Sequence, residues 1–69
     1  MDEDKAAAIA NALEGLYLNQ VAIRASVEEL STWVRQRGSV NIHENVMGAL
    51  QTLDTNADAI ASAIERLRS

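Results

Sequence analysis

Residues 9–34 read IANALEGLYLNQVAIRASVEELSTWV, and this stretch decides the fold of the chain. Apolar residues recur in it at alternating spacings of four and three, and one polar residue, Gln20, interrupts the row. The row consists of Ile9, Leu13, Leu16, Gln20, Ile23, Val27, Leu30 and Val34. This spacing places all its members on one stripe of an α-helix. We therefore expect a long helix whose stripe is covered by the rest of the chain.

A second stretch with the same spacing follows. Its stripe consists of Val46, Leu50, Leu53, Ala57, Ile60, Ile64 and Leu67. Between the two stretches, Gly38 is typical of the left-handed residue that ends a helix. Asn41, followed three residues later by Glu44, matches a capping box. The sequence thus predicts a helix over about 3–37, a turn at 38–40 and a helix over about 41–68.

Length and composition favour an all-α protein that self-associates. The chain has 69 residues, 48% of them apolar, with no Pro and no Cys. Such a short chain buries a small core, and it has neither disulfides nor a cysteine-based zinc site to staple it. The short turn makes the two helices antiparallel neighbours. We predict a single domain over residues 1–69, an antiparallel two-helix hairpin that dimerises into a four-helix bundle.

Charge restricts the possible partners and the location. The net charge of −4 argues against binding to nucleic acid, which needs clustered cations. No apolar run approaches the ~20 residues that cross a bilayer. The N-terminal sequence MDEDK is acidic, whereas a signal peptide begins with basic residues. We expect a cytoplasmic protein without a membrane partner.

Polar residues that could support chemistry have better structural interpretations. His43 has no nucleophile or second metal ligand at a suitable spacing, so a surface or capping role is favoured. The pairs Glu28–Glu29 and Asp54–Asp58 resemble carboxylate pairs, but a solvated helix face explains them better because two helices enclose no pocket. The sequence therefore predicts neither an enzyme nor a cofactor or metal site.

Two residues within or beside the first stripe leave alternatives open. Gln20 is either a ligand contact or, as we favour, a buried amide that fixes helix register. Trp33 is either an interface anchor, a role in which Trp is enriched, or a lid that packs over the turn. Gly15 and Gly48 lie inside helical pattern, and we interpret both as places where another helix approaches closely.

A second apolar surface remains after one helix–helix seam is closed. Its members lie on the back of the first helix, beside its stripe and on the second helix: Leu18, Val21, Ala22, Ala25, Tyr17, Trp33 and Met47. Two apolar surfaces on so small a hairpin imply two coverings. These seven residues are our candidates for contacts with a second copy or with a partner protein.

Four runs in the sequence resemble small proteins of temperate phages and their Gram-negative hosts. They are LYLNQVA at 16–22, ELSTWV at 29–34, RG at 37–38 and NVMGAL at 45–50. Phage anti-quorum-sensing proteins are among the proteins that the chain resembles. The resemblance implies a dimeric helical hairpin made early in infection. It also implies that the protein blocks a LuxR-type quorum-sensing transcription activator and, as a second target, a type IV pilus assembly ATPase. It assigns no contact residues.

Two other function classes remain. The expected shape is similar to the plasmid copy-number regulator Rop, and an RNA-binding protein of that kind would use Arg24, Arg35 and Arg37. A small chaperone of a secretion system or phage particle would instead cover one apolar helix of a client. The surplus apolar surface favours a small dimeric inhibitor or modulator of a host protein such as a transcription activator.

Overall fold

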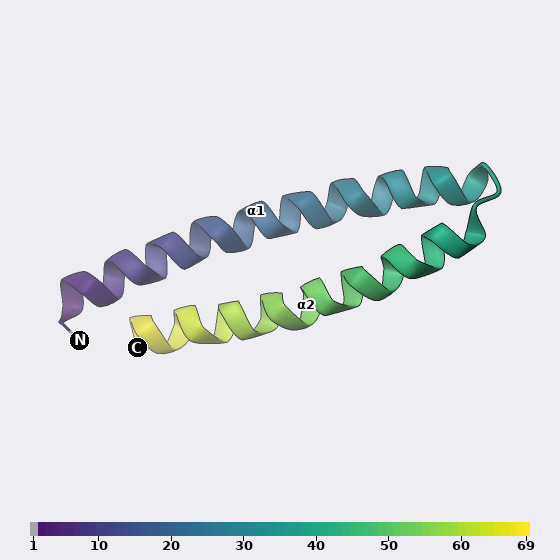
Figure 1. The fold of residues 1–69 in the computed structure, drawn as a ribbon. Helices are drawn as coiled ribbons and strands as arrows, with labels where there is room; N and C mark the ends of the chain where they lie inside the picture. Colours follow the sequence, from purple (N-terminus) through teal and green to yellow (C-terminus); the bar gives the residue numbers. More distant parts are fainter. Residues whose placement is uncertain (1) are drawn as a thin grey trace.

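The chain folds into a hairpin of two long antiparallel helices (Figure 1). The computed structural model describes residues 2–69, in which α1 spans Glu3–Gln36 and α2 spans Val40–Arg68. The Cα trace is a rod of 53 × 15 × 12 Å. The N-terminal end of α1 extends beyond the end of α2. The predicted all-α hairpin is confirmed for these residues.

Local sequence sets the ends of α1. Asp2 is the N-cap, and its side chain accepts a hydrogen bond of 2.8 Å from the backbone N–H of Lys5. At the other end Gly38 has φ +100°, a conformation that costs an L-residue with a Cβ. The N–H of Ser39 then bonds back to the carbonyl of Val34 at 3.2 Å. The predicted role of Gly38 in ending the helix is confirmed.

The predicted capping box of α2 is wrong. The N-cap is Ser39, and its side chain makes no capping hydrogen bond. Asn41 lies inside the helix instead, because the carbonyl of Ser39 already accepts the first helical bond from the N–H of His43 at 3.2 Å. The backbone hydrogen bonds at the end of α1 fix the position of Ser39. Ser39 therefore becomes the N-cap of α2 although its side chain makes no capping hydrogen bond.

Both α1 and α2 contribute every third or fourth residue to the seam between them. On α2, the predicted stripe is buried or half-buried throughout and is confirmed. Ser39 and His43 extend it toward the turn. On α1, the seam consists of Ala6, Ala10, Leu13, Tyr17, Gln20, Arg24, Val27, Ser31 and Val34. Ala10, Ser31 and Leu50 are its most buried members, and Leu50 is only 1% exposed.

Half of the predicted stripe of α1 is therefore wrong. Leu13, Gln20, Val27 and Val34 do face α2. The other four members are exposed: Ile9 to 41%, Leu16 to 60%, Ile23 to 59% and Leu30 to 64%. Their places are taken by the residues one position later, namely Ala10, Tyr17, Arg24 and Ser31. The four predicted residues and the four observed ones each give alternating spacings of four and three when joined to the shared Leu13, Gln20, Val27 and Val34. Spacing alone therefore could not tell which set faces α2.

The helical glycines do not serve close approach inside the hairpin. A Cβ built at Gly15 or Gly48 would meet nothing within 4 Å. The expected close approach is wrong for this pair of helices, whose contact lies on other faces. Both glycines therefore cost helix stability without a packing gain within the chain.

We expect opposite effects from two glycine substitutions. Gly48→Ala should raise the free energy of unfolding by about 1 kcal/mol, the propensity difference in an exposed helix. Gly38→Ala should lower it by about 1–2 kcal/mol, because Ala is strained at the left-handed φ of this residue. Urea denaturation followed by circular dichroism at one protein concentration measures both. A loss of stability in Gly48→Ala would contradict the open surroundings of Gly48.

Candidate protein-binding surfaces

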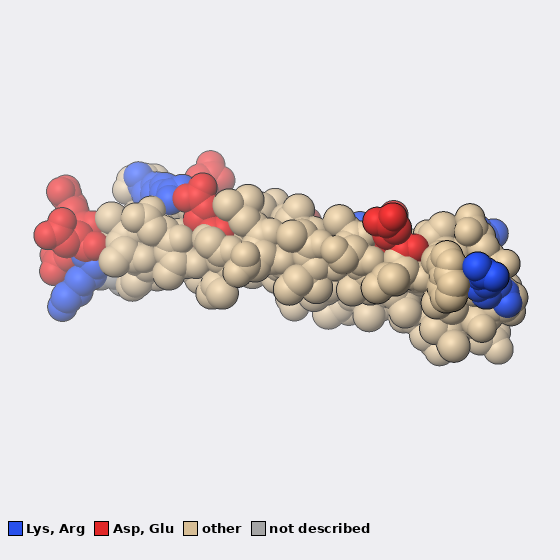
Figure 2. All heavy atoms as spheres, turned by 90° about the horizontal axis from the view of Figure 1, so that it is seen from above, with Lys and Arg blue, Asp and Glu red and all other residues tan. Residues whose placement is uncertain are grey.

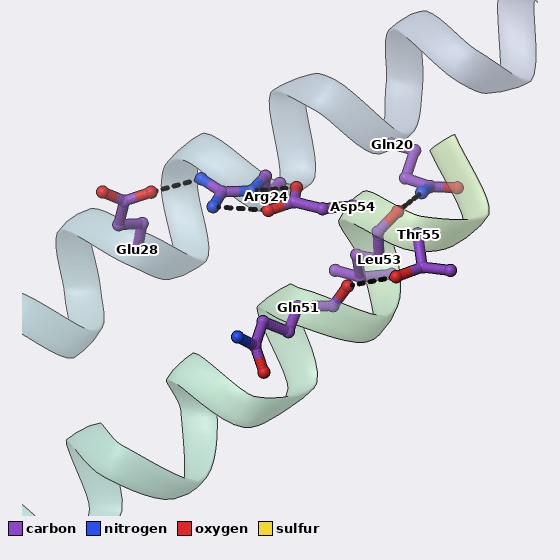
Figure 3. A network of polar contacts seen from close by, with 7 residues as sticks. All are labelled: Gln20, Arg24, Glu28, Gln51, Leu53, Asp54 and Thr55. Atoms are coloured by element: carbon purple, nitrogen blue, oxygen red, sulfur yellow. Dashed lines mark hydrogen bonds and ion pairs between the residues drawn. The ribbon is translucent and has the colours of Figure 1, made fainter. Parts of the chain in front are cut away.

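A polar network ties the middle of the seam together (Figure 3). Gln20 donates from Nε2 to the backbone carbonyl of Leu53 at 2.7 Å. Arg24 donates to both carboxylate oxygens of Asp54, at 2.6 and 3.0 Å, and also to Glu28. The hydrogen bonds to Asp54 and then to Glu28 raise the pKa of Arg24 above its ordinary value. The bond of Gln20 across the seam supports the interpretation of this amide as a register device.

His43 has a structural role in the seam near the turn. Its Nδ1 lies 2.9 Å from the hydroxyl oxygen of Ser31 and 3.2 Å from the backbone oxygen of the same residue. The tautomer with its proton on Nδ1 can donate to that carbonyl. Ser31 is buried and His43 half-buried, so this polar contact lies inside the seam, between half-buried Val34 and Val27 on α1. We expected a surface or capping role for His43, and the structure places its side chain in the seam instead.

The carboxylates suggested by the sequence divide between ion pairs and open surface. Glu28 and Asp54 both bind Arg24, whereas Glu29 and Asp58 are exposed. Outside these two pairs, Glu14 binds Arg68 at 2.7 Å. Among residues 2–69, no three acidic or histidine side chains gather closely enough to hold a metal ion. In the same part of the chain, neither helix is apolar enough over a sufficient length to cross a membrane.

The two long sides of the seam differ in chemistry. On one side lies a charged edge, which consists of Glu14, Arg24, Glu28, Asp54 and Arg68 and is joined by the ion pairs above. The four exposed apolar residues of the predicted α1 stripe each come one position before a seam residue. This offset places them on the side of the seam that lies opposite the charged edge. We call this side the apolar face: Ile9, Leu16, Ile23, Leu30, Trp33 and Ile42. The hairpin thus has an apolar side and an ion-paired side.

Trp33 belongs to the apolar face and is not a buried lid. Its side chain is 54% exposed, and the guanidinium carbon of Arg37 lies 4.8 Å from the ring centroid. Leu30 and Trp33 share a surface hollow with Ser26 and Glu29. An exposed, cation-stacked indole beside an exposed leucine is typical of an interface anchor. The structure therefore favours the first of the two interpretations of Trp33.

A second apolar strip runs along α1 on its outer side. Leu18, Val21 and Ala25 follow one another at spacings of three and four, and all are exposed. Val21 and Ala25 border a shallow groove whose other lining residues are Arg24, Glu28, Glu29, Thr32, Trp33 and Gln36. We call Leu18 together with this lining the outer groove. Figure 2 shows an uncharged stretch in the middle of the rod, with an acidic group between it and the turn end and further charged side chains toward both ends.

The structure separates the candidate interface residues predicted from the sequence. It brings Leu18, Val21 and Ala25 together on the outer groove, with exposed Ala22 adjacent on the same helix. Tyr17 lies half-buried in the seam and is removed from this surface. Trp33 borders both the outer groove and the apolar face, as the two hollows that it lines show. Met47 is 38% exposed on α2.

Sequence reasoning missed the four aliphatic residues of the apolar face that belong to α1. Ile9, Leu16, Ile23 and Leu30 were assigned to the seam with α2 and are exposed instead. A signal existed, because Ala6, Ala10, Tyr17, Arg24 and Ser31 complete a second row of the same spacing. Two overlapping rows give α1 an apolar surface wider than the one stripe that α2 covers.

The single hairpin exposes more surface than a compact globular protein of its mass. Its accessible surface is 5232 Å². A globular monomer of 7.5 kDa would expose about 4,200 Å² by the usual scaling with mass. The excess, about 1,000 Å², is similar in size to the ~800 Å² that one partner contributes to a standard interface.

Comparisons with models of protein families, with curated proteins and with solved structures found no match to this chain.

Proposed function

We propose that this chain is a small protein-binding inhibitor or modulator that acts as a homodimer in the cytoplasm. The observation that carries the proposal is the pair of exposed apolar surfaces, the apolar face and the outer groove, on a rod with one seam. A single partner that covers one of these surfaces leaves the other exposed to solvent. A second copy and a different protein are the two partners that satisfy both surfaces.

The outer groove is the surface that we assign to the other protein. Leu18 is 58% exposed and Val21 is 45% exposed, and Val21 lines the groove together with Glu28 and Glu29. Apolar side chains with a polar margin are typical of protein-binding surfaces. The groove runs along a helix, so it fits a segment of the partner that lies parallel to α1.

The target class comes from the resemblance of the four sequence runs to phage anti-quorum-sensing proteins. On that basis the chain is phage-encoded, and its partner is a LuxR-type transcription activator of the host. A type IV pilus assembly ATPase is the second target that the resemblance implies. The helical hairpin is compatible with this class, and the exposed residues 16, 18, 21 and 33 lie within the runs that carry the resemblance.

The two alternative functions receive less support. RNA binding in the manner of Rop would draw on Arg24, Arg35 and Arg37, but Arg24 is held by Asp54 and Glu28. A chaperone would use an apolar surface to cover one helix of a client, which the outer groove also permits. A purified, folded target distinguishes the inhibitor from a chaperone, which prefers the unassembled client.

Binding of a purified LuxR-type activator, measured by titration calorimetry, tests the proposal. Leu18→Glu should weaken binding by about 30-fold or more, the loss expected for an interface hot spot. Ala59→Glu is the matched control, since it adds the same charge at an exposed position of α2 outside the groove. We expect it to bind like the unmodified chain.

The same titration contains the results that would overturn the proposal. If the unmodified chain bound neither the activator nor the pilus ATPase, the proposed targets would be wrong. Equal binding by Leu18→Glu and Ala59→Glu would remove the outer groove from the contact. Binding that depended steeply on salt and required RNA would transfer the function to the RNA-binding class.

A further inference from the structure

We propose that a second copy of this chain covers the apolar face in antiparallel orientation, with α1 of one copy along α1 of the other. The proposal rests on the proposed function only in requiring a homodimer. It specifies the face, the direction and the position of the twofold axis, which passes beside Asn19 and Gln20. Three features of the described residues lead to it.

The first feature is the symmetry of the apolar row along α1. The helix runs from Glu3 to Gln36, so its midpoint lies between Asn19 and Gln20. The row of Ile9, Leu16, Ile23 and Leu30 has the same midpoint. An antiparallel copy therefore places Leu16 level with the partner's Ile23 and Ile9 level with the partner's Leu30. A twofold interface needs such self-complementarity, in which each residue meets the counterpart of the other.

The second feature is the distribution of charge along α1. Its first turn is acidic, with Asp2 as N-cap followed by Glu3 and Asp4, and Lys5 offsets one of these charges. Its last turn carries Arg35, and Arg37 is the C-cap. In the antiparallel arrangement, Asp4 lies level with the partner's Arg35 and Asp2 level with the partner's Arg37. Parallel copies would bring like charges and like helix dipoles together.

The third feature is the division of surface between the two sides of the seam. The charged edge is already joined by ion pairs within the chain, whereas the apolar face has no such internal partners among its aliphatic residues. The excess exposed area, about 1,000 Å², is close to the ~800 Å² that one subunit buries in a standard interface. A second copy on the apolar face also leaves the groove at Leu18 and Val21 accessible in both subunits.

Single-cysteine crosslinking tests the arrangement directly, because the chain has no cysteine. Ala12, Asn19 and Ser26 are exposed on α1, and each lies three residues after a member of the apolar row and thus beside it. Asn19→Cys treated with a short bis-maleimide should give a covalent dimer as the main product. Ala12→Cys and Ser26→Cys should give little dimer alone but should crosslink to each other when mixed. Val21→Cys, near the same level but about 160° from Asn19 around the helix, should remain uncrosslinked.

Each other pattern overturns the proposal. Strong crosslinking of Ala12→Cys and Ser26→Cys, each with itself, would mean parallel copies. Crosslinking at Val21→Cys would place the dimer on the outer groove of α1. A monomer in sedimentation equilibrium of the unmodified chain would remove the second copy altogether. That last result is distinguishable from failure of the proposed function, which is measured by binding of the activator to the outer groove.

Discussion

Leu50→Ala is expected to lower the free energy of unfolding by about 2–5 kcal/mol, the cost of truncating a fully buried leucine. Leu50 is 1% exposed and is the largest fully buried side chain of the described residues. A chain of 69 residues has a total stability of roughly 3–10 kcal/mol at typical values per residue. The substitution therefore removes a large share of it. Because Ala is the best helix former, the loss reports burial and not helix propensity.

Thermal unfolding followed by circular dichroism measures this effect. A shift of 1 kcal/mol moves the Tm of a domain of this size by about 4–8 °C, so we expect a fall of at least about 8 °C. Leu18→Ala is the matched control, because the same atoms are removed from a side chain that is 58% exposed, and its Tm should change little. All chains must be compared at one concentration, since association adds to stability. Similar Tm values for the two variants would contradict the seam described here.

A charge introduced at Ile23 should have a different effect from a charge at Val27. Val27 is half-buried in the seam with α2, so Val27→Glu places a carboxylate among apolar groups and should unfold the hairpin. Ile23 is 59% exposed in the monomer, so Ile23→Glu should leave the helices intact. In the proposed dimer it places a charge from each copy in the interface. We expect its self-association to weaken by about 100-fold or more.

Helix content from circular dichroism and dimer fraction from sedimentation equilibrium separate these outcomes. At high protein concentration Ile23→Glu should retain its helix signal while the dimer fraction falls. Loss of helix in both variants at every concentration would show that Ile23 lies in the intrachain seam, as the sequence alone had predicted. An unchanged dimer in Ile23→Glu would instead remove the apolar face from self-association.

Much of the hairpin follows from local features of the sequence. The helix bounds and the turn follow from Asp2, Gly38 and the long runs of helix-forming residues, whose effects act within a few positions. The stripe of α2 was also predictable, because a single apolar row dominates that helix. The start of α2 was not, since the backbone bonds at the end of α1 replaced the capping box that the sequence offered at Asn41.

The candidate surfaces were only partly predictable. Leu18, Val21 and Ala25 were identified because they lie off any seam that the spacing allows. Ile9, Leu16, Ile23 and Leu30 were assigned to the wrong neighbour, and Tyr17 was assigned to the surface although it is half-buried in the seam. Both errors come from one rotation of α1 by about 50°, half of the 100° step between successive helix residues.

The sequence by itself thus determined two helices, their direction and the existence of surplus apolar surface, because periodicity and turn chemistry are local properties. Only the tertiary structure decided which side of α1 meets α2. Two overlapping rows share Leu13, Gln20, Val27 and Val34, and either row closes a seam of the same spacing. The observed choice pairs Arg24 with Asp54 and Ser31 with His43, contacts between residues 30 and 12 positions apart in the chain. Such polar pairs are satisfied only when both helices are in place, so a row of apolar residues could not reveal them.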